Sequence, residues 1–147
     1  MTLTSLLVVL GSTLVNLSAA AQSRGTLTVE VSGLRDLVGQ LCVNIFAAGQ
    51  SFPEGSGVPG QGKCVPITAN SIAVQFENLA YGNYAVAAYH DRNQDNQLNQ
   101  GAFGIPLEGF GFSRNPSIGF GPPSFESAQI SHGAAQTKTV LQLRYLQ

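Results

Sequence analysis

The chain has 147 residues, of which seven are Lys or Arg and eight are Asp or Glu, so its formal net charge is −1. That length is typical of one domain. No basic cluster is present, which disfavours nucleic-acid binding and docking on anionic membranes, because both need clustered Lys or Arg.

The N-terminal residues 1–21 have the pattern of a secretion signal. An apolar stretch precedes three alanines, Ala19 to Ala21, which provide the small residues of a cleavage site. A retained membrane anchor is the alternative, but polar residues interrupt the apolar run, and a span needs about 20 mostly apolar residues. We therefore expect an exported protein, periplasmic or extracellular. Residues 22–147 would form one β-sandwich domain with no integral membrane span after cleavage.

Short segments with strand patterns follow one another along the rest of the chain. In several of them, apolar and polar residues alternate with a period of two. The segments are residues 26–32, 40–47, 63–69, 71–77, 84–90, 125–132 and 137–145. Turn residues separate them, and no segment has a helical period of useful length. The pattern predicts an all-β fold, a single antiparallel Greek-key β-sandwich of about seven strands.

Two cysteines lie in the second and third of these segments, Cys42 and Cys64. In an exported chain an even number of cysteines predicts a disulfide, and two buried thiols are the alternative. The loop between them, residues 49–62, is rich in Gly and Pro. A bridge across it would stabilise the fold by about 3 kcal/mol on the loop-entropy model.

Residues 89–125 are too long for a simple turn and contain six glycines and five phenylalanines. The segment begins with oxygen-bearing residues at alternate positions: Asp91, Asn93, Asp95, Gln97 and Asn99. The first three match the first ligand positions of a calcium loop, in which Gln97 would offer its backbone carbonyl. Glu108 would add a carboxylate from the next turn. The sequence therefore predicts calcium as the one candidate cofactor.

Two features of this loop decide how strong such a site would be. Asn96 can adopt the left-handed conformation that Gly would otherwise supply. Ala102 occupies the twelfth position, where calcium loops place a bidentate Glu, so the expected affinity is weak. The alternative is a solvated turn that Asp and Asn stabilise by hydrogen bonds to the backbone.

His90 precedes the loop and suggests a second class of function. With Asp91 or Glu108 it would serve acid–base chemistry in a small envelope hydrolase. The sequence places no nucleophile beside it, and His132 is far away without ligand spacing, so a structural histidine is the simpler interpretation. The aromatic residues Phe110, Phe112, Phe120 and Phe125 either pin the glycine-rich segment to the sandwich or line a ligand groove.

A series of motifs in fixed order spans nearly all of residues 22–147. They are V-S-G-L-R at 31–35, G-Q-L-C-V at 39–43, F-P at 52–53, F-E-N-L-A-Y-G-N-Y-A-V at 76–86, H-D-R-N-Q-D at 90–95, G-I-P-L-E-G-F-G-F-S at 104–113 and F-G-P-P-S-F at 120–125. In this order they resemble the bacterial domain of unknown function 2141 family of exported proteins.

The resemblance implies a prealbumin-like (transthyretin-like) sandwich and no established activity. The family pattern has Gly where Asn96 stands and an acid where Asn99 stands, and both differences weaken a metal site here. We expect a non-enzymatic binding or structural module, with the hydrolase as the alternative. Its partner would be a small molecule, a glycan or a protein.

Overall fold

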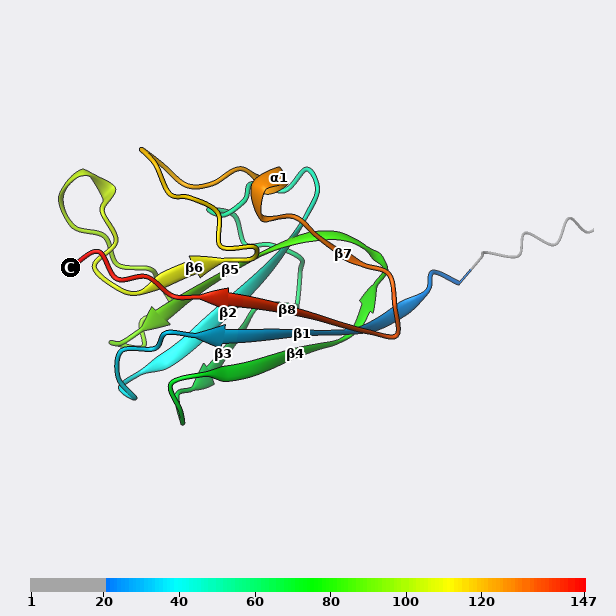
Figure 1. The fold of residues 1–147 in the computed structure, drawn as a ribbon, viewed down its shortest axis with the longest axis horizontal. Helices are drawn as coiled ribbons and strands as arrows, with labels where there is room; N and C mark the ends of the chain where they lie inside the picture. The colour runs from blue at the N-terminus through cyan, green and yellow to red at the C-terminus, as the bar shows by residue number, and fades with distance from the viewer. Residues whose placement is uncertain (1–20) are drawn as a thin grey trace, which may run out of the picture.

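The computed structural model describes residues 21–147, which form two β-sheets packed face to face (Figure 1). The signal predicted for residues 1–21 lies outside the described residues except for Ala21. Eight strands are present in the described part, where about seven were expected, and helix is confined to two short pieces. The all-β sandwich predicted from the period of two is therefore confirmed.

The smaller sheet has the strand order β4–β1–β8. These strands are β1 (Arg24–Ser32), β4 (Ile72–Ala80) and β8 (Gln136–Gln142). β4 runs antiparallel to β1, whereas β8 runs parallel to it, with Thr26 opposite Gln136. The parallel pairing carries the C-terminal end of the chain to the same end of the sandwich as the end of β1.

The larger sheet has the order β3–β2–β5–β6, and β7 pairs with another part of β5. These strands are β2 (Gln40–Ala47), β3 (Lys63–Pro66), β5 (Gly82–Asp91), β6 (Phe110–Phe112) and β7 (Ile130–His132). All of their pairings are antiparallel. Cys42 in β2 lies opposite Cys64 in β3, and the two form the predicted disulfide, with Cα atoms 4.0 Å apart.

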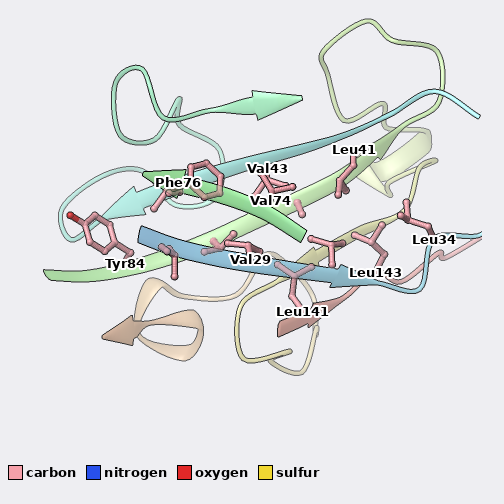
Figure 2. Packing of buried hydrophobic residues seen from close by; sticks show 14 of the residues in the cluster. Val29, Leu34, Leu41, Val43, Val74, Phe76, Tyr84, Leu141 and Leu143 are labelled. Atoms are coloured by element: carbon pink, nitrogen blue, oxygen red, sulfur yellow. The ribbon is translucent and has the colours of Figure 1, made fainter. Parts of the chain in front are cut away.

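The main core lies between the two sheets (Figure 2). Alternate residues of the strands point into it, including Val29 of β1, Val43 of β2, Val74 of β4 and Leu141 of β8. Each of these residues lies in a segment predicted to be a strand. Burial of the inner face of each sheet explains why the period of two marks strands such as β1 and β4.

A second apolar cluster covers the outer face of the larger sheet. It contains Ala85 and Ala87 of β5 and both phenylalanines of β6, with Phe52 and Phe125 packed against them. The rings of Phe52 and Phe112 meet edge to face at 5.6 Å, which is a favourable aromatic geometry. β5 is therefore buried on both faces, and its sequence carries alanines instead of a clean alternation.

β4 runs past the predicted end to Ala80, and β6 forms within the predicted long loop, whereas three predicted strands are shorter than expected. Residues 125–132 are not one strand: the helix α1 (Phe125–Ala128) comes first and β7 follows. The Oγ of Ser124 accepts a hydrogen bond from the amide of Ser127 at 3.3 Å and caps this helix. The strand predicted for residues 63–69 ends early. β3 stops at Pro66, because Pro has no amide proton for a further hydrogen bond to the neighbouring strand.

The last strand also ends earlier than residue 145. After β8 the chain leaves β1, and Arg144 exchanges two backbone hydrogen bonds with Phe110 of β6, at 2.8 and 3.0 Å. This crossing joins the smaller sheet to the larger one at one end of the sandwich. It also places Tyr145 beside the end of β5, where the candidate site lies.

Candidate functional site

A surface hollow of about 250 Å³ lies at the end of the sandwich where β5 finishes. Its side chains come from three separate segments: the turn after β1, residues 90–109, and the C-terminal residues. The polar lining consists of Arg35, Asp36, His90, Arg92, Glu108 and Tyr145. We name it the end hollow. These segments lie together at one end of the ribbon, near the label C (Figure 1).

His90 is completely buried at the base of the end hollow, and both of its ring nitrogens are hydrogen-bonded. Nε2 lies 2.6 Å from the carbonyl oxygen of Val38, and Nδ1 lies 2.7 Å from the hydroxyl of Tyr145. A carbonyl can only accept, so Nε2 must carry the proton. A neutral ring then accepts from Tyr145 through Nδ1, which leaves no free ring nitrogen to act as a general base.

Tyr145 connects His90 to the outer part of the end hollow. Its hydroxyl accepts a hydrogen bond from the amide of Arg35 at 3.1 Å, and the Arg35 guanidinium stacks over its ring at 4.1 Å from the centroid. Burial raises the pKa of the Tyr145 phenol, so it stays protonated at neutral pH. The ring lies directly against Gly109, where a Cβ atom would overlap it, and any larger residue there would displace Tyr145.

Asp36 and Arg92 form an ion pair at the mouth of the end hollow. Arg92 Nε lies 3.1 Å from one carboxylate oxygen of Asp36, and the other accepts from the amide of Val38 at 2.9 Å. The hydrogen bond from Val38 is the main reason why the pKa of Asp36 is lowered, and Arg92 adds to the effect. Asp36 also lies 3.7 Å from His90 Nε2, beyond hydrogen-bond distance, on the side of the ring that donates to Val38.

The carboxylate of Asp91 organises the start of the following loop. It is completely buried, and it accepts hydrogen bonds from the amides of Asp95 at 3.1 Å and Asn96 at 2.8 Å, and from the side chain of Gln40 at 2.8 Å. Asn96 has φ = 60°, the left-handed conformation expected for it from the sequence. Because consecutive strand residues point to opposite faces, Asp91 lies on the opposite side of β5 from His90.

Glu108 closes the other side of the same loop. Its two carboxylate oxygens accept from the amides of Arg92 at 2.9 Å and Asn99 at 3.1 Å, so it holds both ends of residues 92–99. Its side chain is largely buried. No hydrogen bond joins His90 to Asp91 or to Glu108 in the part of the chain that the structure describes. The residues of the alternative hydrolase site thus share one end of the sandwich without forming an acid–base pair.

Asp95 lies at the exposed side of the loop. It accepts hydrogen bonds from the side chains of Asn99 at 2.8 Å and Asn93 at 3.1 Å, and from the amide of Gln97 at 3.0 Å. The bond from Asn99 is the first cause of its lowered pKa. These contacts place Asn93, Asp95 and Gln97 in one turn, as the calcium pattern requires.

The five predicted calcium ligands do not gather into an obvious metal centre. Among residues 21–147, no group of three or more His, Cys, Asp or Glu side chains is placed to hold a metal ion. The buried carboxylates of Asp91 and Glu108 instead accept from backbone amides. Calcium binding by this loop stays a prediction, and the hydrogen-bonded turn accounts for every contact described above.

The aromatic residues of the glycine-rich segment divide into two groups. Phe110 and Phe112 are buried in the outer cluster, and Phe125 packs against it. Phe103 and Phe120 are wholly exposed. Pinning to the sandwich therefore describes the first group, whereas Phe120, expected to pin or to line a groove, does neither.

Sequence reasoning did not single out Arg35, Asp36 or Tyr145 as site residues. Arg35 occurs at the end of one quoted motif, but nothing local connects it to Tyr145, 110 positions later. Their contact depends on the parallel pairing of β1 with β8. A long-range pairing of this kind leaves no periodic signal in the residues themselves.

Three further findings place the chain among known proteins. No helix within residues 21–147 is long and apolar enough to cross a membrane. Comparison with curated proteins and with solved structures gave no match. The sequence profile of a family described as an uncharacterized protein conserved in bacteria (DUF2141) matches residues 29–140, which is well over half of the chain and includes the end of β1, the disulfide and most of the end hollow. The chain therefore belongs to the domain of unknown function 2141 family.

Proposed function

We propose that this protein is an exported, non-enzymatic β-sandwich that binds a small polar ligand in the end hollow. The observation that carries the proposal is the state of the polar groups there. The ring nitrogens of His90 and the carboxylates of Asp91 and Glu108 are all engaged in hydrogen bonds that hold the fold together. Such groups give a rigid floor for a ligand and leave little capacity for proton transfer.

The outer groups of the end hollow support binding. Arg35 donates one guanidinium hydrogen bond to the main-chain oxygen of Gln147 at 2.7 Å, and Arg92 uses only Nε toward Asp36. The remaining guanidinium N–H groups have no partner among residues 21–147. An Arg fork of this kind matches phosphate and carboxylate oxygens in geometry and charge.

Export is the second part of the proposal. The disulfide between Cys42 and Cys64 fits an oxidising compartment, since cytosolic thiols are kept reduced. The signal pattern in residues 1–21 points the same way. Cell fractionation with mass spectrometry tests this directly: the mature protein should start at Gln22, contain no free thiol and appear outside the cytoplasm. A cytoplasmic protein with an intact N-terminus would contradict it.

The binding part is tested by titrating the purified protein with small phosphorylated, carboxylated and sugar compounds while recording its NMR spectrum. A ligand should shift the signals of His90, Tyr145 and Gly109 together. Arg35→Gln should weaken that binding, whereas Arg114→Gln, an exposed arginine outside the end hollow, serves as the matched control and should not. Shifts scattered over the surface, or equal effects of the two substitutions, would contradict the proposal.

The alternative hydrolase makes a different prediction. Turnover of model ester, amide or phosphoester substrates should then disappear in His90→Gln and persist in His132→Gln, in which the other buried histidine is changed. Tyr145→Phe would remove the hydroxyl that donates to His90 Nδ1. Hydrolysis that depends on His90 in this way would replace the binding proposal by an enzymatic one.

The loop of residues 91–99 supports calcium as a second candidate function. The specific observation is that Asn96 adopts φ = 60° and that Asp95 accepts hydrogen bonds from the side chain of Asn93 and the amide of Gln97, which holds these residues in one exposed turn. Without an acid at position 102 we expect an affinity of about 10⁻⁴–10⁻³ M, as in extracellular modules. Millimolar calcium should then raise the melting temperature of the wild type but not that of the variant Asp95→Ala.

The variant Asp95→Ala keeps Asn93 and removes only the carboxylate of Asp95, so a lost response to calcium is due to that carboxylate. The melts are recorded with excess calcium and with excess chelator, because a bound ion stabilises the folded state by mass action. Equal melting temperatures of the wild type in the two buffers would show that the loop is a hydrogen-bonded turn without a metal.

A further inference from the structure

Exposed apolar side chains lie in the three segments that form the end hollow. They are Leu37 and Val38 in the turn after β1, Phe103, Ile105 and Leu107 in the following long loop, and Leu146 near the C-terminus. Phe103 is wholly exposed, and the other five are between 42% and 54% exposed. The segments that carry them lie at the same end of the molecule (Figure 1). We name these six residues the apolar rim.

Phe103 is held out from the molecule by an ordered loop. The amide of Gly101 donates to the carbonyl of Ile105 at 2.8 Å, and the amide of Leu107 donates to the carbonyl of Asn99 at 2.9 Å. Phe103 itself has φ = 59°, a left-handed conformation that is unusual for a bulky residue. A strained residue with a wholly exposed aromatic ring, at the tip of a hydrogen-bonded loop, points to recognition of a partner.

The charges of the end hollow are balanced. Arg35 and Arg92 contribute two cations, and Asp36 and Glu108 contribute two carboxylates. The oxygens of Glu108 accept from backbone amides, whereas Asp36 lies at the mouth beside Arg92. The mouth therefore offers guanidinium donors to an anion and a carboxylate to a cation within the same small volume.

From this arrangement we propose that the apolar rim docks on a bilayer of zwitterionic phospholipid, with one headgroup in the end hollow. Arg35 and Arg92 bind its phosphate, Asp36 binds its ammonium, and the rim enters the boundary of the acyl chains. The inference rests on the proposed binding function of the end hollow. It also agrees with a net charge of −1 and the lack of a basic cluster, which give no attraction to anionic lipid.

The order of polar and apolar groups favours a bilayer over a protein partner. Protein interfaces usually have an apolar centre and a polar margin. Here six of the eight lining residues are polar, and the exposed apolar residues follow them in the same three segments, which is the order that a headgroup surrounded by acyl chains requires. Binding of an interfacial protein scales with the apolar area that it buries, so the rim should set the affinity.

The experiment measures binding of the purified, disulfide-bonded protein to vesicles by flotation. One set contains phosphatidylethanolamine and phosphatidylcholine, and a second contains added phosphatidylglycerol. We expect binding to the zwitterionic vesicles with no increase on the anionic ones. Phe103→Ser with Leu107→Ser should weaken it at least tenfold, and Arg35→Gln should weaken it severalfold.

Two controls test whether the rim is specific. Val140→Ser changes a valine of β8 that is 49% exposed and lies outside the rim, and Phe120→Ser changes a wholly exposed phenylalanine outside it. Both should bind vesicles like the wild type. If Phe120→Ser weakens binding as much as Phe103→Ser, the attachment is unspecific and the inference is wrong.

The remaining outcomes separate this inference from the proposed function. If soluble glycerophosphoethanolamine shifts the NMR signals of His90 and Tyr145 but vesicles are not bound, the bilayer inference fails and the end hollow remains a ligand site. If neither binds, the inference is wrong and the binding proposal loses this ligand class. Sedimentation showing a dimer that Phe103→Ser dissociates would assign the rim to a second copy and overturn the bilayer.

Discussion

Removing the carboxylate of Asp91 is the sharpest test of how the candidate site is built. In Asp91→Ala the amides of Asp95 and Asn96 and the side chain of Gln40 lose their common acceptor. Hydrogen bonds to a charged group contribute about 1.5–3 kcal/mol each when the partner is left unsatisfied. Water can reach part of this loop, so the three losses will not add in full.

We expect the free energy of unfolding to fall by about 3 kcal/mol, a large share of the roughly 5–15 kcal/mol typical of a domain. With a urea m-value of about 1.5 kcal/mol/M, the midpoint of unfolding would fall by about 2 M. The measurement is urea denaturation followed by circular dichroism. It is made with excess chelator, so that metal binding has no part in the result.

Two variants make the result specific. Asp91→Asn keeps the shape and one acceptor oxygen but turns an amide toward donors, so it should lose nearly as much stability as Asp91→Ala. Asp95→Ala removes an exposed carboxylate from the same loop and should lose much less. Equal midpoints for Asp91→Ala and Asp95→Ala would refute the assignment of Asp91 as the organising acceptor.

Replacing Cys42 and Cys64 by Ala should lower the free energy of unfolding by about 3 kcal/mol, measured in urea, because their disulfide restricts the unfolded chain; an unchanged midpoint would contradict this. The backbone of Phe103 is in the left-handed conformation, which Gly adopts without strain. Phe103→Gly should therefore give an equal or higher melting temperature by calorimetry, and a clear decrease would show that the ring has packing partners. Burial raises the pKa of Tyr89 from 10.0 to about 12. The stability from its protonated phenol is therefore complete below pH 10 and lost as the pH rises through about 12. The titration is measured as the phenolate absorbance of the wild type minus that of Tyr89→Phe as the pH rises. A midpoint of this difference near pH 10 would contradict the burial of Tyr89.

The sequence was a good guide wherever one face of a strand meets the core. In β1, Leu27, Val29 and Val31 are completely buried and alternate with more exposed residues, so the period of two marks the strand directly. β2 also begins and ends at the predicted residues, although Cys42 and Phe46 on its other face are buried too. Hydrophobic burial acts on each strand separately, which makes it readable from a short window of sequence.

Elements whose conformation depends on distant partners could not be predicted in this way. Residues 125–132 alternate like a strand, yet the first four form α1 because Ser124 caps them and Phe125 packs on Phe52. β8 ends at Gln142 because Arg144 pairs with β6 instead. The packing of Phe125 and the pairing of Arg144 depend on distant segments, whereas the cap by Ser124 is local and was missed in the sequence.

The loop after β5 shows the same division on a smaller scale. The role of Asn96 and the clustering of Asn93 with Asp95 follow from local spacing and were predicted. Glu108 was expected to join this loop as a metal ligand, and it does reach it, through the amides of Arg92 and Asn99. Sequence spacing indicated that Glu108 meets this loop. In the folded chain its carboxylate accepts hydrogen bonds from backbone amides, a role that the spacing did not indicate.

The distribution of hydrogen bonds indicates where in this molecule function should be sought. No buried side-chain nitrogen or oxygen within residues 21–147 lacks a partner. His90, Asp91 and Ser113 therefore stabilise the sandwich, and recruiting any of them for chemistry would cost the fold a buried hydrogen bond. The groups with free capacity are at the surface: the guanidinium ends of Arg35 and Arg92 and the apolar rim around them. A protein with this division of roles is suited to binding at one end, because a ligand can dock there without rearranging the core.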